Sequence, residues 1–371
     1  MAKDIPEEVS VEQREMSRRR FLRNAGAVAS LPLLGGLADI LSSEGAGAAT
    51  YARHSDHPLF AKHPKYKFVV VNHVTTNSFF TATQYGLADA AAITGSTYQW
   101  TGSTDSVVSE MVSAMDTAIA AKANGIGVAL IDPVAFDTPV DTALGAGIPV
   151  IAYNADVPTG YVNNRMAYIG QSNLTAGAAV GTHIASLVKK GGLVAGIIAT
   201  PGSSNIQPRL DGAKPIFKKA GLKFVEVGTS ATEGQPELSK IEAFYASNKD
   251  VACMMSVDGG DSDALAQFIL NNHLKGKFVA TCWDTGVPVI DAVASGACTL
   301  TIDQQAYLQG FVTLIQLFLY NISGGLMKPQ DTDTGTAIVT KTLAKPYETA
   351  TRWEGTSAKE GVLTPPARIP F

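Results

Sequence analysis

Short apolar runs alternate with longer amphipathic segments along most of this chain, and no other feature limits its fold as strongly. The runs have the length of β-strands and end in turn-forming residues, whereas the segments between them have helical periodicity. Continuous apolar runs are typical of parallel strands that helices bury on both faces, so the sequence predicts an α/β fold. Strands are expected at 66–72, 96–100, 126–131, 148–153, 192–199, 223–228, 251–256, 277–282 and 298–302. Helices are expected between them, for instance at 105–123, 174–190, 205–220, 259–274 and 305–324.

The pattern also repeats at the scale of a domain. The strand, polar turn and helix that begin at Tyr66 recur in similar form from Gly192, a spacing too long for a solenoid repeat. The sequence therefore predicts two Rossmann-like lobes with parallel sheets, a ligand cleft between them and three crossovers. The expected first lobe is 60–170 plus 305–330, and the expected second lobe with the tail is 171–304 plus 331–371.

Charge and cysteine content exclude several classes of protein. A net charge of −4 over 371 residues argues against a nucleic-acid partner. Cys253, Cys282 and Cys298 lack the spacing of a zinc site, so no metal is expected. No cofactor is expected either. We expect buried thiols in strands, and a Cys253–Cys282 disulfide stays open as the alternative.

The N-terminus is typical of an export signal. SRRRFLR at 17–23 precedes a weakly apolar stretch and the small residues EGAGAAT, in the order of a cleavable signal. The segment resembles a twin-arginine signal, which predicts a signal peptide at 1–48, cleavage near Ala48 or Ala49, and a periplasmic location. An amphipathic anchor or a single membrane helix is the alternative, and the exact cleavage point stays open.

Polar and aromatic side chains follow the predicted strands, at the edge where open α/β sheets bind ligands. Carboxylates and amides hydrogen-bond to vicinal hydroxyls, while aromatic rings cover C–H faces, so this mixture suits a polyhydroxylated ring better than a phosphate. The candidate ligand residues are Asn77, Phe79, Phe80, Asn154, Asp156, Arg209, Asp258, Trp283, Asp284 and Gln304.

In these residues the chain resembles the type I periplasmic sugar-binding proteins of the ribose-binding branch, over residues 65–340. The first strand of that family ends in Asn-x-Phe-Phe, which 77–80 matches, and this implies that Phe79 and Phe80 sandwich or line the sugar. The resemblance assigns further ligand roles to Arg209 of PRLDG, to Asp258, to the Trp283-Asp284 pair and to Gln304 of TIDQ.

One position departs from the family pattern. After the strand that ends IPVIAYN the family commonly has Asp-Arg, whereas this chain has Asn154 and Ala155, with Asp156 next. The missing arginine leaves the identity of the sugar or polyol open.

Each candidate also has a structural alternative. Phe79 and Phe80 could belong to the core, Asp258 or Asp284 could cap a helix, and Arg209 could form a surface ion pair. His73 has no nucleophile in a recognisable motif beside it, so we expect an ordinary strand-end histidine rather than a catalytic base.

The resemblance implies a monomeric receptor that captures a sugar or polyol by hinge closure and delivers it to the membrane permease of an ABC importer. A periplasmic sensor for a chemoreceptor or sensor kinase stays open as an alternative. A dinucleotide-dependent enzyme is disfavoured because no G-x-G-x-x-G follows the first strand, so the protein is not expected to be an enzyme. A sugar-responsive repressor is disfavoured because residues 1–60 read as an export signal rather than a helix-turn-helix.

Overall fold

The computed structural model describes residues 59–158, 160–348 and 352–355, which belong to one compact unit that begins at Leu59. The predicted signal peptide and its cleavage point lie outside the described residues. Among the described residues, no helix has both the length and the hydropathy needed to cross a membrane.

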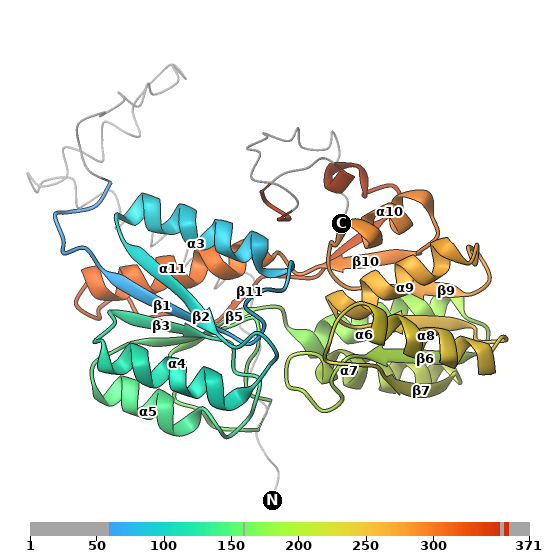
Figure 1. Cartoon of the computed structure of the whole chain (residues 1–371), viewed down its shortest axis with the longest axis horizontal. Coiled ribbons are helices and arrows are strands. Elements are labelled where there is room, and N and C mark those ends of the chain that lie inside the picture. Colours follow the sequence, from blue (N-terminus) through green and yellow to red (C-terminus); the bar gives the residue numbers. More distant parts are fainter. Residues whose placement is uncertain (1–58, 159, 349–351, 356–371) are drawn as a thin grey trace, which may run out of the picture. The chain divides into compact units, whose positions relative to one another are not determined.

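The strands form two separate sheets (Figure 1). All the paired strands of the first sheet are parallel, in the order β11-β5-β4-β3-β1-β2. Its strands are β1 (Lys67–Asn72), β2 (Thr97–Gly102), β3 (Gly125–Val128), β4 (Val150–Tyr153), β5 (Ala167–Gly170) and β11 (Thr332–Asp333).

The second sheet repeats this plan in the order β12-β10-β9-β8-β6-β7, and its edge strand β12 is antiparallel to β10. The two sheets confirm the predicted α/β class with two lobes. The strands are β6 (Leu193–Ile198), β7 (Lys223–Gly228), β8 (Cys253–Ser256), β9 (Val279–Thr281), β10 (Leu300–Asp303) and β12 (Ala337–Thr340).

Helices cover both faces of each sheet (Figure 1). On the first sheet, α3 and α11 pack together on one face, and α4 and α5 lie on the other. On the second sheet, α6 packs on α7, and α9 packs on both α8 and α10. The helices are α3 (Phe80–Thr94), α4 (Val108–Ala120), α5 (Asp137–Gly145), α6 (Asn173–Leu187), α7 (Gln207–Ala220), α8 (Gln235–Ser247), α9 (Gly259–Asn271), α10 (Val287–Ser295) and α11 (Ala306–Ile322), followed by the 3-10 turn η1 (Lys345–Glu348).

Burial explains why strands inside the sheets, such as β1, have no alternation of polar and apolar residues. In β1, every residue after Lys67 is buried, because helices cover the sheet on both sides. The first lobe has one core cluster around its sheet, and the second lobe has one cluster on each face. Both lobes are thus rigid supports for the loops at the strand ends.

The chain passes between the sheets three times: between β5 and α6, between β10 and α11, and between β11 and β12. The strand β11 pairs with β5 in the first sheet, so the last crossover follows Asp333. In this strand the structure differs from the predicted second-lobe range of 331–371. The lobe boundaries as a whole stay a prediction.

All three cysteines are buried and free. The Sγ atoms of Cys282 and Cys298 lie 3.6 Å apart as hydrogen-bonded thiols, and Cys253 lies in β8. The Cys253–Cys282 disulfide that the sequence left open is therefore not formed in this structure.

Candidate functional site

The carboxyl ends of the strands meet around three adjoining cavities of about 70, 330 and 370 Å³, which we call the inner, outer and lower cavity. Asn77 and Gly259 line all three, so together the cavities form one cleft between the lobes. The inner cavity collects all the predicted site residues except Asp156 and Trp283. Its walls contain Asn77, Phe79, Phe80, Asn154, Arg209, Asp258, Asp284 and Gln304, together with His73, Val74, Asn205, Ile206 and Gly259.

Arg209 is the buried cation of the inner cavity. Its Nε donates to Asn173 Oδ1 at 3.0 Å and its Nη1 to the carbonyl of Val257 at 2.6 Å. Its Nη2 donates to Gln304 Oε1 at 3.3 Å. Burial lowers the pKa of Arg209, and the carboxylates of Asp284 and Asp258 oppose this effect. The planar guanidinium is thus held by contacts on several sides, as its fork of donors allows.

Trp283 lies beneath Arg209 rather than in the cleft. Its side chain is fully buried, and the guanidinium carbon of Arg209 lies 4.8 Å from the centre of the ring. The indole N–H donates to Gln171 Oε1 at 3.1 Å. This cation–π contact supports the guanidinium from the core side, so in this structure Trp283 acts on the cleft through Arg209.

Asp156 also lies outside the cleft. It forms a two-point ion pair with Arg165, in which Nε donates to Oδ1 at 2.7 Å and Nη2 donates to Oδ2. The pair lines a separate cavity of about 430 Å³, together with Gln171 and Asp331. The sequence could not show this partner, because the contact depends on the loop between β4 and β5.

Backbone strain marks two of the predicted site residues. Asn154 has φ 62° and directly follows β4, whereas Asp284 has φ 67° and follows β9 after two residues. The left-handed region is unfavourable for residues with a Cβ and occurs most often where the surrounding structure holds a side chain in place. Gln304 Nε2 donates to Asp284 Oδ1 at 2.6 Å, and Asn154 Nδ2 donates to Gln309 Oε1 at 3.0 Å. A hydrogen bond therefore holds the side chain of each of these two residues in place.

The two phenylalanines have different roles. Phe80 is only 2% exposed and its ring packs edge-on against His73, at 5.5 Å between ring centres. Phe79 is partly exposed, lies at the start of α3 and lines both the inner and the outer cavity. The rings meet at 87° with centres 4.8 Å apart, so Phe80 supports Phe79 from the core.

Side chains of the two lobes also meet directly across the cleft. Asn77 Nδ2 donates to a carboxylate oxygen of Glu233, and Ser204 Oγ donates to the carbonyl of Leu130 at 2.9 Å. Asn205 Nδ2 lies 3.4 Å from His73 Nε2. Sequence reasoning did not single out Glu233 as a site residue, because it lies in a loop with no apolar strand directly before it.

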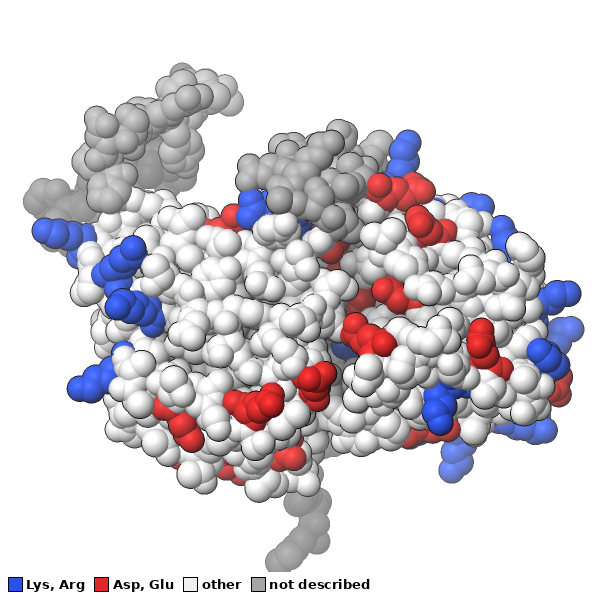
Figure 2. Space-filling view, viewed as in Figure 1, with Lys and Arg blue, Asp and Glu red and all other residues white. Residues whose placement is uncertain are grey.

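Carboxylates dominate the electrostatics of the cleft. Burial raises the pKa of Asp284 to about 6, although Arg209 and the hydrogen bond from Gln304 oppose this shift. Burial and the neighbouring Asp284 and Glu233 raise the pKa of Asp263 to about 7. Figure 2 shows acidic side chains in the middle of the drawn face and most basic ones toward its two ends. The cleft therefore disfavours anionic ligands and suits neutral or cationic ones.

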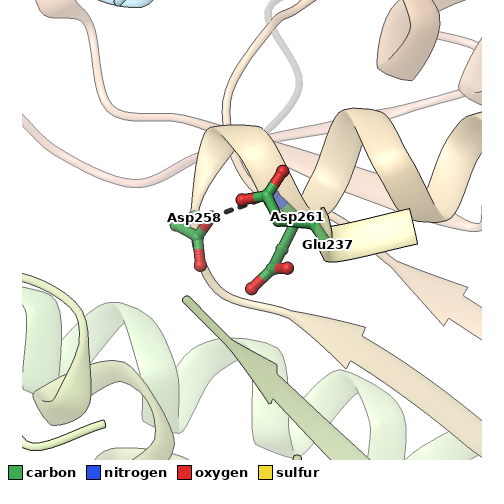
Figure 3. A group of neighbouring side chains, drawn as sticks. All are labelled: Glu237, Asp258 and Asp261. Carbon is green, nitrogen blue, oxygen red and sulfur yellow. Dashed lines mark hydrogen bonds between the residues drawn. The ribbon is translucent and has the colours of Figure 1, made fainter. Parts of the chain in front are cut away.

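A cluster of three carboxylates lies next to the lower cavity (Figure 3). One oxygen from each of Glu237, Asp258 and Asp261 lies within 4.8 Å of the others, a separation at which oxygens could share a hard divalent cation. The same groups already cap helices, because Asp258 Oδ1 accepts the N–H of Asp261 at 3.0 Å and Glu237 Oε2 accepts the N–H of Gly234 at 2.9 Å. Helix capping at the starts of α8 and α9 therefore explains why these three carboxylates lie close together.

Two α/β lobes with a polar cleft at the strand ends define the class of periplasmic binding proteins. The chain matches the model of the periplasmic binding protein domain over residues 68–320 and belongs to this family, which confirms the resemblance found in the sequence. It is 38% identical to the xylose/arabinose-binding protein XylF of Sulfolobus acidocaldarius, over 96% of this chain and 93% of that protein.

Solved structures share the fold. A solute-binding protein of an ABC transporter from Burkholderia graminis, determined in complex with D-arabinose, is 25% identical and has a TM-score of 0.70, covering 76% of this chain and 97% of that chain. A carbohydrate transporter from Acidothermus cellulolyticus in complex with myo-inositol is 22% identical and also has a TM-score of 0.70, covering 79% and 100% of the two chains. At that identity the second likeness shows the fold alone.

Proposed function

We propose that this protein captures a sugar or polyol between its lobes and delivers it to an ABC importer. The observation that carries the proposal is the convergence of planar polar groups from both lobes on one cleft, with Asn77 and Asn154 from the first and Arg209, Asp258 and Asp284 from the second. Pentoses are the leading ligand class, because the relative at 38% identity is named a xylose/arabinose-binding protein.

The side chains of the inner cavity suit distinct parts of a sugar. Asp284 and Asp258 offer acceptors to hydroxyl groups, and the amides of Asn154 and Gln304 can both donate and accept. Phe79 offers an apolar face to C–H groups. Arg209 donates to any hydroxyl oxygen within its reach, and its contacts with protein groups hold it in place before a ligand arrives.

Closure follows from the position of these groups on two lobes. A ligand that contacts both lobes binds the closed form more tightly than the open form, so it shifts the population toward closure. The crossovers at 171–172, 304–305 and 334–336 are the points where such a hinge would bend. A closed receptor is then the form that a permease distinguishes from the empty one.

A thermal-shift screen followed by calorimetry tests the proposal. The protein from residue 50 onward would be mixed with D-xylose, L-arabinose, D-arabinose, D-ribose, D-glucose and myo-inositol. A ligand at 100 times its Kd stabilises the native state by about 2.7 kcal/mol, so at least one sugar should raise the Tm in a saturable way. Absence of a shift and of binding heat for every compound would overturn the proposal.

Export and assembly complete the proposal. Residues 1–48 would direct the folded protein through the twin-arginine pathway into the periplasm, where it would act as a monomer with the importer's permease. Because that pathway reads arginine rather than charge alone, changing Arg18 and Arg19 to Lys together should abolish export. Unchanged amounts of exported protein in a fractionation experiment would contradict this route.

A further inference from the structure

The chain near its C-terminal end is anchored on both lobes. The 3-10 turn η1 (Lys345–Glu348) packs on α10 of the second lobe. There the hydroxyl of Tyr347 donates to Asp303 Oδ2 at 3.0 Å, directly beside the crossover that follows β10.

Residues 352–355, which we call the C-terminal segment, lie instead on α3 and α11 of the first lobe. Arg352 Nη2 forms an ion pair with Asp89 Oδ1 at 2.9 Å, and its guanidinium carbon lies 4.9 Å from the ring centre of Tyr85. The ring of Trp353 meets Tyr307 edge-on, with centres 4.9 Å apart.

Gly355 brings the segment into backbone contact with α3. It has φ 84°, and a Cβ at this position would lie 2.9 Å from the backbone nitrogen of Ala82. Only glycine allows so close an approach in this conformation without strain. The segment is therefore fitted to the surface of α3 by an ion pair, ring contacts and backbone packing.

This placement makes the segment part of the cleft. Trp353, Glu354 and Gly355 line the outer cavity of about 330 Å³. The same cavity is lined by Asn77 and Phe79 of the first lobe and by Glu233, Asp263 and Asp284 of the second.

Trp353 is more exposed than the large aromatic rings predicted for the ligand site. Trp283 is fully buried beneath Arg209 and Phe80 is 2% exposed, so neither ring offers a face to a ligand in this structure. Trp353 is 45% exposed and lies in the same cavity wall as Phe79. Indole rings are the largest apolar faces that a side chain can offer to sugar C–H groups.

We propose that the C-terminal segment is a wall of the ligand site and that Trp353 contacts the bound sugar. The inference rests on the proposed function and extends it to a residue outside the matched family domain, which ends at 320. A sugar that contacts Trp353 on the first lobe and Asp284 on the second would join the lobes and so favour the closed arrangement.

Calorimetric titration with D-xylose and L-arabinose tests this role. Trp353→Ala should weaken binding of the preferred sugar about 10-fold or more, as expected for loss of an aromatic anchor, while Trp353→Phe should retain most of the affinity. Leu326→Ala is the matched control, because Leu326 is 88% exposed and lies outside the described cavities, so its affinity should equal that of the wild type.

Tryptophan fluorescence gives a second readout. The chain has three tryptophans, and Trp353 is the exposed one of the described set, so a sugar-dependent change in emission should be lost in Trp353→Ala. Unchanged affinity and an unchanged emission response in this variant would overturn the inference while leaving the proposed function intact. A wild-type protein that binds none of the screened sugars would instead overturn the proposed function, and the inference with it.

Discussion

At the residue scale, Arg209 links the inner cavity of the cleft to the core. Below it lies the buried ring of Trp283, and around it lie the carbonyl of Val257 and the amides of Asn173 and Gln304. A buried guanidinium is tolerable because its donors are satisfied and because Asp284 and Asp258 supply opposite charge nearby. The position of Arg209 in the cleft therefore depends on Trp283 and Asn173, which do not line the inner cavity.

Replacing Arg209 by Lys should weaken sugar binding and lower the stability of the protein. An ammonium group cannot make three separate planar contacts, so at least one buried acceptor would lose its partner at a cost of about 1–3 kcal/mol. Calorimetry and urea unfolding would measure both effects. Lys214→Arg on the same helix is the control, because the Lys214 side chain is partly exposed. Wild-type affinity and stability of Arg209→Lys would contradict the role proposed for the guanidinium contacts.

The carboxylates of the cleft predict a pH dependence of stability. The pKa of Asp263 is raised to about 7 and that of Asp284 to about 6, both chiefly by burial. A carboxyl group whose pKa is higher in the folded than in the unfolded state contributes stability that is fully present below its unfolded pKa near 4. This contribution is lost as the pH rises through the folded pKa.

The protein without sugar should therefore lose stability from these two groups as the pH rises from about 4 to about 8. Asp263→Asn removes one titrating group and its repulsion with Asp284 and Glu233, so the slope of unfolding free energy against pH should become shallower. Urea unfolding at several pH values measures the slope. Equal slopes for the variant and the wild type would count against the raised pKa.

At the element scale, pairs of helices approach so closely that only glycine fits between them. In the second lobe, a Cβ at Gly212 of α7 would lie 2.0 Å from the carbonyl oxygen of Leu174 in α6. In the first lobe, a Cβ at Gly86 of α3 would lie 2.1 Å from the carbonyl oxygen of Tyr307 in α11. In each lobe, a glycine therefore allows close packing between the helix that follows a crossover and the helix that follows the first strand. These pairs are α11 with α3 and α6 with α7.

Gly212→Ala should destabilise the protein by about 1–3 kcal/mol or more, because the added methyl group must separate α6 from α7. Since α7 carries Arg209, the sugar affinity should fall as well. Gly145→Ala at the end of α5 is the control, because a Cβ there meets no atom within 4 Å, and it should be neutral or slightly stabilising. Equal unfolding curves for both variants would disprove the packing argument.

At the scale of the whole described unit, a few polar contacts join the two lobes and would bias an equilibrium between open and closed forms. Ser204 Oγ on the second lobe donates to the carbonyl of Leu130 on the first, and Asn77 donates to Glu233 in the opposite direction. Such a bond contributes about 0.5–1.5 kcal/mol, which is enough to change the fraction of closed molecules several-fold.

Ser204→Ala should weaken sugar binding about 2- to 10-fold without loss of fold, since it removes one of the bonds that join the two lobes in this structure. Ser186→Ala is the control, because that hydroxyl donates to His183 within its own helix. Calorimetry gives the affinity, and small-angle scattering with and without sugar gives the degree of closure. An affinity equal to that of the control would show that this bond does not bias the lobes.

The sequence by itself determined the sheets and the order of the site residues. Apolar runs such as Lys67–Asn72 and Leu193–Ile198 are local signals, and parallel strands bring whatever follows them to one edge. For that reason Asn77, Arg209, Asp258 and Asp284 could be selected without coordinates. The short strands β5, β11 and β12 were not predicted, because so few residues carry no period that distinguishes them from loops.

Tertiary structure alone decided which of these side chains reach the cleft. Trp283 and Asp284 are neighbours in the sequence, yet the ring is buried beneath Arg209 while the carboxylate lines the cavity, since the backbone of Asp284 is left-handed. Glu233 and Trp353 reach the same cavity from a loop and from the C-terminal segment, without any local pattern that predicts it. Their positions depend on how two lobes and a distant stretch of chain pack together, and periodicity in one sequence does not contain that information.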